Sequence, residues 1–265
     1  MVTNGHSLAG LRVLVTRPAH QADRLCALIE HAGGTALRFP TIEISPPQDS
    51  LALEHIIERL DEFDLAIFVS PNAVNRAFPL IQRRHATLPP QLDVACIGNG
   101  SAAALAQFGV TPALVPATRA DSEGLLALPR LQHVTGLRIV IFRGEGGREL
   151  LADTLVARGA HVEHAQCYRR TRPMTDVTAL TSAFTQHAID VVTITSIDAL
   201  RNLYDMLDAS ARESLRQMPV ITVSKRLQQT CQTLSLRGPV QVAETASDEA
   251  VVAALDTWRR SQKPL

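Results

Sequence analysis

The chain contains one sequence pattern twice, and the two copies lie 126 residues apart. Residues 10–17 read GLRVLVTR and residues 136–143 read GLRIVIFR, which agree at four positions. The same offset continues without a gap, pairing Leu25 with Leu151, Gly33 with Gly159, Asp64 with Asp190, Ala73 with Ala199 and Glu123 with Glu249. Self-similarity in one register indicates a duplicated structural unit, so the chain must build two versions of one fold.

Each copy alternates short apolar segments with segments of helical periodicity. The apolar segments are typical of strands buried on both faces of a parallel sheet. They are residues 13–16, 65–69 and 94–97 in the first copy, and 139–142, 191–195 and 220–223 in the second. Helices are predicted to begin near Asn72, Ser101, Ser122, Asp198, Lys225 and Ser247. This alternation predicts the α/β class with two parallel sheets.

Two segments at equivalent places in the copies break this pattern. Residues 39–47 (FPTIEISPP) and 166–173 (QCYRRTRP) are rich in extended-chain residues and bounded by prolines. Proline cannot donate a backbone hydrogen bond, so such segments belong at sheet edges or in connections. We therefore predict two linker strands, which could pair with each other.

Charge and hydropathy exclude several classes of protein. The chain has 26 basic and 26 acidic side chains, so its net charge indicates neither a nucleic-acid nor a membrane partner. No apolar run approaches the roughly 20 residues of a membrane span, and residues 1–11 do not resemble a signal peptide. We expect a cytoplasmic protein, and a monomer because no long apolar helix face is left over.

We expect neither a metal site nor a cofactor. Cys26, Cys96, Cys167 and Cys231 are scattered in apolar segments, where they suit buried thiols rather than zinc ligands. The nine histidines show no HExxH or HxH spacing. The glycines of residues 144–147 lack the spacing of a dinucleotide-binding or P-loop motif, and no GxSxG motif or evident triad occurs.

Small, hydroxyl-bearing, glycine and basic residues follow the predicted strands. Ligands bind beyond the carboxyl ends of parallel strands, where helix N-termini offer unpaired N–H groups to an anion. We predict that a ligand with many carboxylates or phosphates binds at Arg17, Ser70, Asn72, Gly98, Asn99, Ser101, Arg143, Gly144, Gly146, Arg148, Ser196, Ser224, Lys225 and Arg226. The alternative is that serines and asparagines only cap helices, glycines only form turns and arginines are solvated.

Four acidic residues that match between the copies are predicted to be structural. Asp64 and Asp190 precede their strands, at the end of the sheet away from the ligand loops, and suit turns or caps. Glu123 and Glu249 fall in the first turns of predicted helices, where a carboxylate complements the helix dipole.

The motifs with the most specific spacing surround residue 143. They are RGEGGREL at 143–150, RGA at 158–160 and CYRR at 167–170, accompanied by LVTRP at 14–18, FP at 39–40, SPNAV at 70–74, IG at 97–98, TS at 195–196, VS at 223–224 and RL at 226–227. On these motifs the chain resembles uroporphyrinogen-III synthases of bacterial type over nearly its whole length. It departs from them in the stretch from Lys225, which is variable in the family.

This resemblance implies two flavodoxin-like parallel-sheet domains joined by a two-stranded linker, with the ligand cleft between them. The implied boundaries are residues 1–38 and 175–265 for domain one, 45–165 for domain two, and 39–44 and 166–174 for the linker strands. Each domain would then take strands from both copies. The alternative topology is a tandem pair of domains split near Thr135.

The resemblance also implies a reaction. Members of the family convert hydroxymethylbilane, a linear tetrapyrrole with eight carboxylates, to uroporphyrinogen III, with inversion of the terminal pyrrole ring and loss of water. A weak acid near the leaving hydroxyl would help this step. Tyr168, one of two tyrosines, lies on a predicted linker strand and is the candidate acid. It could instead be a packing residue with a hydrogen-bonded hydroxyl.

Two other classes of function remain open. A non-catalytic two-domain protein could bind a polyanionic small molecule with the same loops, although no signal peptide or output segment is visible. A nucleotide-dependent α/β enzyme is disfavoured because the phosphate-binding motifs are missing. The isomer formed from hydroxymethylbilane would separate all three.

Overall fold

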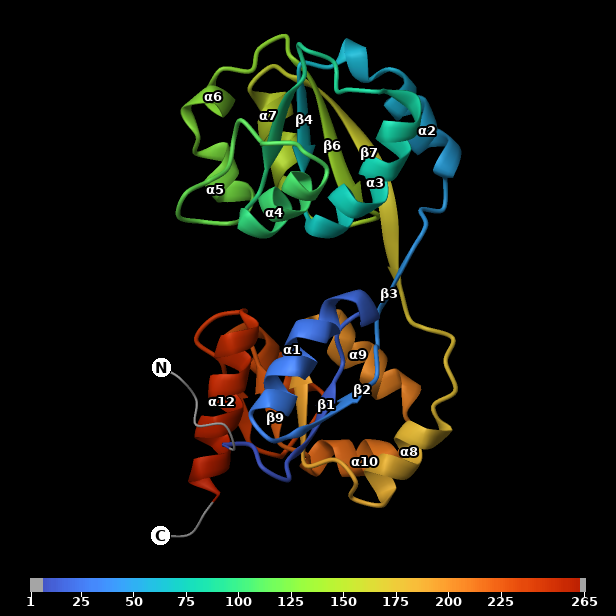
Figure 1. Ribbon diagram of the computed structural model, residues 1–265, viewed down its shortest axis with the longest axis vertical. Coiled ribbons are helices and arrows are strands. Elements are labelled where there is room, and N and C mark those ends of the chain that lie inside the picture. The colour runs from blue at the N-terminus through green and yellow to red at the C-terminus, as the bar shows by residue number, and fades with distance from the viewer. Residues whose placement is uncertain (1–6, 263–265) are drawn as a thin grey trace. The chain divides into compact units, whose positions relative to one another are not determined.

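The computed structural model describes residues 7–262, which form two compact units. Unit 1 comprises residues 7–43 and 171–262, and unit 2 comprises residues 44–170. The chain starts in unit 1, builds all of unit 2 and then completes unit 1 (Figure 1). The ends of the predicted first domain, residues 1–6 and 263–265, lie outside the described residues.

Unit 1 is a five-stranded parallel sheet with helices on both faces (Figure 1). In spatial order its strands are β10 (Val240–Val242), β9 (Val220–Thr222), β8 (Val191–Ile194), β1 (Arg12–Val15) and β2 (Thr35–Arg38). One face carries the helices α1 (Ala19–His31) and α12 (Asp248–Ser261). The remaining helices are α8 (Thr178–Thr185), α9 (Ile197–Met206), α10 (Ala209–Gln217) and α11 (Lys225–Thr233).

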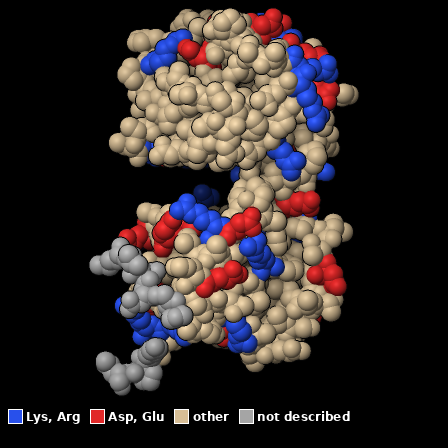
Figure 2. Space-filling view, viewed as in Figure 1, with Lys and Arg blue, Asp and Glu red and all other residues tan. Residues whose placement is uncertain are grey.

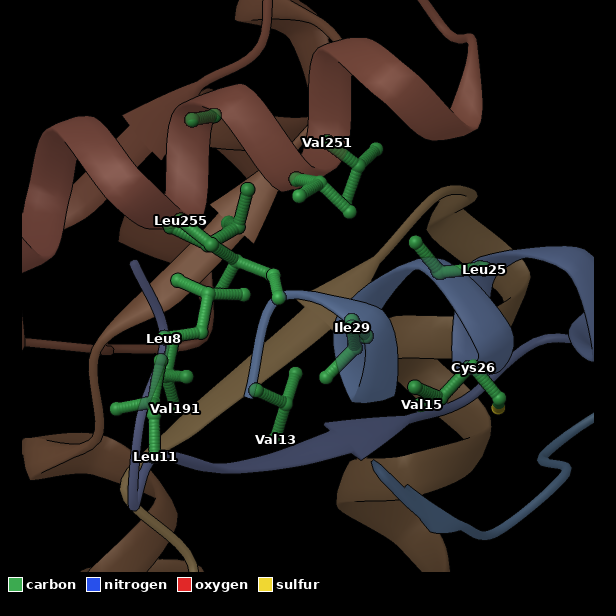
Figure 3. Packing of buried hydrophobic residues seen from close by; sticks show 14 of the residues in the cluster. Leu8, Leu11, Val13, Val15, Leu25, Cys26, Ile29, Val191, Val251 and Leu255 are labelled. Atoms are coloured by element: carbon green, nitrogen blue, oxygen red, sulfur yellow. The ribbon is translucent and has the colours of Figure 1, made fainter. Parts of the chain in front are cut away.

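The core of unit 1 lies between this sheet and the helices α1 and α12. Val13 and Val15 of β1, Leu25 and Ile29 of α1 and Leu255 of α12 belong to one buried cluster (Figure 3). Leu25 and Ile29 are four residues apart and therefore lie on the same face of their helix. Because burying each such side chain contributes roughly 1.5–3 kcal/mol, the cluster accounts for the docking of both helices.

Unit 2 is a five-stranded sheet in the order β3 (Glu43–Ser45), β7 (His161–Thr171), β6 (Arg138–Gly144), β4 (Leu65–Phe68) and β5 (Asp93–Cys96). The ladders from β7 to β5 are parallel. Its helices are α2 (Ser50–Glu58), the 3-10 turn η1 (Leu60–Glu62), α3 (Pro71–Arg84), α4 (Asn99–Gln107), α5 (Ser122–Leu126), α6 (Pro129–Gln132) and α7 (Leu150–Ala157).

The two faces of the second sheet have different cores. On one face, apolar residues of β4 and β6 form a buried cluster with α5 and α7. On the other, the rings of Phe68 and Phe142 stack with centroids 4.6 Å apart, and Phe78 of α3 lies 5.3 Å from Phe68. Alternate residues of a strand point to opposite faces, so both faces of these strands are buried.

Each sheet combines the two copies of the duplicated sequence. With an offset of 126 residues, β1 corresponds to β6, β4 to β8 and β5 to β9. The order β9-β8-β1-β2 in unit 1 is therefore equivalent to the order β5-β4-β6-β7 in unit 2. In unit 2 an isolated bridge between Ala95 and Leu114 occupies the position that corresponds to the pairing of β9 with β10 in unit 1. Because β4 pairs with β6 across Thr135, the tandem topology is not the one observed.

The copy-matched aspartates hold strands of the opposite copy. Asp190 Oδ2 accepts the backbone N–H of Arg12 at 2.7 Å, and Asp64 Oδ2 accepts that of Arg138 at 2.8 Å. Hydrogen bonds from Arg12 also hold the pKa of Asp190 below its ordinary value. These aspartates are structural, as predicted, but they bind a neighbouring strand and do not cap a turn.

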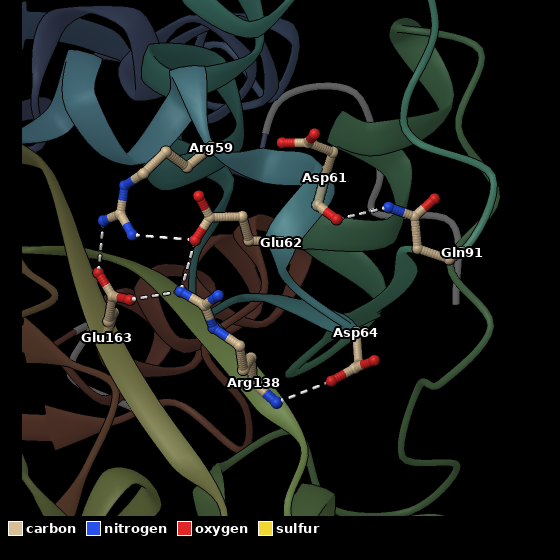
Figure 4. Close-up of polar contacts among 7 residues, drawn as sticks. All are labelled: Arg59, Asp61, Glu62, Asp64, Gln91, Arg138 and Glu163. Carbon is tan, nitrogen blue, oxygen red and sulfur yellow. Dashed lines mark hydrogen bonds and ion pairs between the residues drawn. The ribbon is translucent and has the colours of Figure 1, made fainter.

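A network of ion pairs closes the amino end of the second sheet (Figure 4). Glu163 lies 2.9 Å from Arg59 and 3.5 Å from Arg138, and Glu62 lies 2.7 Å from Arg138. Figure 2 shows charged side chains of both signs at this end of unit 2, whereas the surface over α4 carries none. These four side chains at the amino end thus form ion pairs with one another, away from the loops predicted to bind a ligand.

The predicted α/β class with parallel sheets is confirmed, and so are most of the predicted elements. The helices predicted near Asn72, Ser101, Ser122, Asp198, Lys225 and Ser247 begin within two residues of those positions. In the predicted linker segments, β3 lies beside β7. The strands β2 and β10 were not predicted, because their residues are half-buried or exposed and form no continuous apolar run.

Candidate functional site

Six of the residues singled out from the sequence line one cavity at the carboxyl end of the sheet of unit 2: Ser70, Arg143, Gly144, Gly146, Arg148 and Tyr168. The cavity encloses about 300 Å³. Apolar side chains form part of its wall, namely Val69, Ile97, Ile141, Leu151 and Ala152. Apolar walls with a few convergent polar groups are typical of small-molecule sites.

Tyr168 reaches this cavity because β7 contains a bulge. Arg143 pairs with Gln166, but the next residue of β6, Gly144, pairs with Tyr168, so Cys167 is left without a partner. Cys167 and Tyr168 are both buried, although they are neighbours on a strand, and each is only 2% exposed. Bulges re-aim side chains and are frequent beside active sites.

The hydroxyl of Tyr168 lies 3.1 Å from Ser70 Oγ. Ser70 follows β4 and caps α3, because its Oγ accepts the N–H of Ala73 at 3.1 Å. Its own hydrogen can therefore be donated to the phenol oxygen, which leaves the phenolic hydrogen free for another acceptor. Arg170 Nη2, 3.5 Å from the same oxygen, can only donate. The arrangement suits a tyrosine that gives a proton to a bound ligand.

Glycine is required at position 144 by its contact with Tyr168. A Cβ atom at Gly144 would lie 2.7 Å from both Cε2 and Cζ of the tyrosine ring. Atoms at that distance overlap, so a larger residue would displace the ring. The first glycine of the RGEGGREL motif, Gly144, is thus explained by its close approach to Tyr168. Its backbone conformation does not require glycine, because its φ is not positive.

Arg143 is buried and makes its contacts within the protein. Its Nη1 donates to the Glu149 carboxylate at 3.0 and 3.1 Å, and its Nη2 donates to the Gly146 carbonyl at 2.5 Å. Only 6% of the residue is exposed. These contacts hold the loop of residues 144–149 in place, whereas direct binding of a ligand by Arg143 stays a prediction.

His164 of β7 is the third partner of Arg143. Nη1 of Arg143 lies 3.2 Å from His164 Nδ1. Since a guanidinium only donates, this nitrogen must accept, and the imidazole is neutral with its proton on Nε2, 3.8 Å from Glu149. Burial, and next the charge of Arg143, lower the pKa of His164, while Glu149 and Asp153 oppose the shift.

This lowered pKa predicts a loss of stability in weak acid. As the pH falls below about 6.5, the unfolded chain protonates its histidine before the folded protein does. The free energy of unfolding therefore falls as the pH drops from about 6.5 to the folded pKa of His164. Above about pH 6.5 the histidine is neutral in both states, and no stability is lost. In urea unfolding at pH 7.5 and 5.5, the variant His164→Gln should lose less stability on acidification than the wild type.

His161→Gln is the matched control, because His161 is exposed at the start of the same strand. It should show the same loss of stability on acidification as the wild type. Equal pH dependence of the two variants would contradict the role of His164.

The other predicted residues of unit 2 begin helices beside the cavity but are not among its lining residues. Asn72 lies in the first turn of α3, and Asn99 and Ser101 lie in the first turn of α4. Gly98 precedes α4, where a Cβ atom would lie 2.7 Å from Ala120 Cβ. Close packing therefore accounts for the glycine at position 98, and ligand binding by all four residues stays a prediction.

The predicted residues of unit 1 lie at the equivalent ends of its strands and helices. Ser196 and Ser224 cap α9 and α11, accepting the N–H groups of Ala199 and Leu227 at 3.1 and 3.2 Å. Lys225 and Arg226 are exposed in the first turn of α11. Arg17, the counterpart of Arg143, forms an ion pair with Asp248 in which both side chains are 13% exposed.

Three polar lining residues, Ser122, Glu145 and Arg170, were not singled out from the sequence. Arg170 could have been found, because it lies two residues after Tyr168 and side chains two apart on a strand share a face. Ser122 was predicted only as the start of a helix, and its place in the wall depends on the packing of α5.

The buried thiol beside the cavity does not suit nucleophilic chemistry. Burial raises the pKa of the Cys167 thiol to about 12, so this thiol is no nucleophile near neutral pH. Within residues 7–262, no group of three or more His, Cys, Asp or Glu side chains is placed to hold a metal ion. In the same range, no helix has the length and apolar character needed to cross a membrane.

Comparison with known proteins gives consistent matches. A family model described as uroporphyrinogen-III synthase HemD matches residues 23–253. The uroporphyrinogen-III synthase of Escherichia coli (strain K12) is 34% identical over 246 residues, which cover 92% of this chain and 100% of the relative. A mutant uroporphyrinogen III synthase from the extremely thermophilic bacterium Thermus thermophilus has a similar fold, with a TM-score of 0.60, 17% identity, and coverage of 95% of this chain and 98% of that chain. The Helicobacter pylori uroporphyrinogen-III synthetase gives a TM-score of 0.61, 14% identity, and coverage of 94% and 100%.

Proposed function

The chain belongs to the uroporphyrinogen-III synthase family, and we propose that it cyclises hydroxymethylbilane to uroporphyrinogen III as a lyase of tetrapyrrole biosynthesis. The resemblance inferred from the sequence motifs is confirmed by the family model and by the relative from Escherichia coli. The observation that carries the proposed chemistry is the cavity of unit 2, which brings the Ser70–Tyr168 hydroxyl pair together with Arg148 and Arg170.

The charges of the substrate suit the loops of both units. Hydroxymethylbilane has eight carboxylates. Arg148 and Arg170 line the cavity of unit 2, and Lys225 and Arg226 stand at the N-terminus of α11 in unit 1. Charge-assisted hydrogen bonds from such groups are the strong ones. We propose that these residues bind carboxylates of the substrate.

The main task of the enzyme is orientation. The bilane also cyclises without assistance, but then its terminal ring is not inverted. Inversion requires that the substituted carbon of the terminal pyrrole, and not its free carbon, meets the reactive methylene. Holding the chain in one geometry can supply a large part of the rate. The arginines and helix N-termini are the groups that would hold it.

Tyr168 would act on the leaving hydroxyl. It would give its proton to the hydroxymethyl oxygen, so that water leaves and an azafulvenium cation, with its pyrrole N–H retained, remains beside the phenolate. Attack by the substituted carbon then gives a spiro-pyrrolenine, which fragments and recloses with the ring inverted. The phenolate would recover a proton when the last pyrrole carbon loses one. Ser70 would steady the phenol oxygen throughout, because its hydroxyl can donate to that oxygen.

The test is the isomer formed by the purified protein. Hydroxymethylbilane is supplied, the products are oxidised to uroporphyrins, and isomers I and III are separated by chromatography. We expect isomer III to dominate when enough enzyme is present for the catalysed reaction to be faster than the unassisted cyclisation. Isomer I alone, together with tight binding of the bilane, would instead indicate a non-catalytic binder of polyanions.

We further propose that the protein acts as a cytoplasmic monomer. All four cysteines are free and buried, which suits a reducing compartment. Sedimentation at several concentrations should give the mass of one chain, 28.7 kDa, and a concentration-dependent rise in mass would contradict the monomer.

A further inference from the structure

The arginines that line the cavity of unit 2 differ in whether a carboxylate neutralises them. Arg143 lies 3.0 Å from Glu149, and Arg148 lies 3.4 Å from Glu123. Within residues 7–262, no carboxylate lies within ion-pairing distance of Arg170. Arg170 is therefore the cavity arginine whose charge the protein leaves unmatched.

The position of Arg170 follows from the bulge in β7. After Cys167 the alternation of the strand resumes, so Tyr168 and Arg170 share one face and Arg169 points to the other. The guanidinium carbon of Arg170 lies 5.8 Å from the centroid of the Tyr168 ring, and Nη2 lies 3.5 Å from its hydroxyl. The tyrosine ring thus positions the arginine beside the proposed acid.

The guanidinium retains most of its donors. It has five N–H groups, and the 3.5 Å contact with the Tyr168 hydroxyl is at the long limit of hydrogen bonding. A carboxylate could accept two parallel N–H bonds from the planar fork at about 2.8 Å. The remaining acid on the cavity wall, Glu145, accepts the backbone N–H of Gln48.

We propose that Arg170 binds one carboxylate of the linear tetrapyrrole, in a bidentate pair beside the Tyr168 hydroxyl. Arg170 then determines which part of the linear tetrapyrrole lies at Tyr168, and so contributes to substrate orientation. The inference rests on the proposed function, because it takes the carboxylated bilane as the ligand. It adds a residue that binds the substrate next to the acid.

The kinetic test compares Arg170→Gln with Arg169→Gln. Both remove one positive charge from neighbouring exposed positions of one strand, but only residue 170 lines the cavity. Loss of a hydrogen-bonded ion pair should raise KM for hydroxymethylbilane roughly 10- to 100-fold in Arg170→Gln, and less than about 3-fold in Arg169→Gln. Arg170→Lys should recover only part of the loss, because a single ammonium cannot form the bidentate pair. An equal KM in the two glutamine variants would overturn the proposal.

A binding measurement separates this proposal from the proposed reaction. Equilibrium dialysis with uroporphyrin III, which keeps all eight carboxylates, should give a higher Kd for Arg170→Gln than for Arg169→Gln. If the wild type forms only isomer I but this difference persists, the reaction is wrong and Arg170 remains a carboxylate-binding residue. If isomer III forms and the Kd values agree, Arg170 does not bind the substrate. Unchanged thermal unfolding of both variants shows that the comparison concerns folded protein.

Discussion

Replacing Tyr168 by phenylalanine should lower kcat for uroporphyrinogen III formation by about 100-fold, while KM changes less than about threefold. The substitution removes only the hydroxyl, which lies 3.1 Å from Ser70 Oγ. The ring, and with it the contact with Gly144, is retained. A proton donor acts in the transition state, so its loss appears in turnover more than in binding. Initial rates with isomer analysis measure both constants.

Tyr204→Phe is the matched control for this prediction. Tyr204 is the second tyrosine of the chain and lies on α9 of unit 1, where its hydroxyl accepts a hydrogen bond from Arg216 at 2.6 Å. Its loss should leave kcat within about twofold and cost about 1 kcal/mol of stability at most. Unchanged turnover in Tyr168→Phe would remove the tyrosine from the chemistry and leave it as a packing residue.

Replacing Gly144 by alanine should impair both turnover and stability. The new Cβ would lie 2.7 Å from two ring carbons of Tyr168, so the ring must move from its place between Ser70 and Arg170. Overpacking of a filled site costs about 1–3 kcal/mol. A displaced acid should lower kcat at least about tenfold, since small misplacements of reacting groups are costly. Urea unfolding and the isomer assay measure the two effects.

Gly100→Ala provides the comparison. Gly100 lies in the first turn of α4, and its Cβ would have Pro71 Cγ as its neighbour at 3.4 Å, an ordinary contact. A helical glycine replaced by alanine should gain about 0.5–1 kcal/mol without loss of turnover. Gly144→Ala behaving like Gly100→Ala would mean that the ring of Tyr168 tolerates displacement.

The central strands were predictable because burial on both faces leaves a signal in the sequence. Residues 191–195 (VVTIT) are all β-branched, and β8 is buried along its whole length. The edge strand β2 has two exposed residues of four and leaves no such run. The bulge at Cys167 was not predictable, because it is defined by the register between β7 and β6.

The same distinction applies to the site. Ser70 and Tyr168 could be proposed because their positions relative to strands follow from local patterns. The contacts of Arg143 could not be foreseen, because they depend on where the loop returns Gly146 and Glu149 to the guanidinium. The arginine that lacks a carboxylate, Arg170, could be recognised only when the partners of the other two were known.

The interleaved sheets have a consequence for the order of folding during synthesis. When residue 171 leaves the ribosome, every strand of the second sheet has been made. The strands β1 and β2, although made first, still lack β8, and the contact from Arg12 to Asp190 spans 178 positions of the chain. Contacts so distant in sequence form slowly. Residues 7–43 of unit 1 must therefore wait with one edge of the apolar strand β1 unpaired while unit 2 folds, and in this interval the nascent chain is most exposed to aggregation.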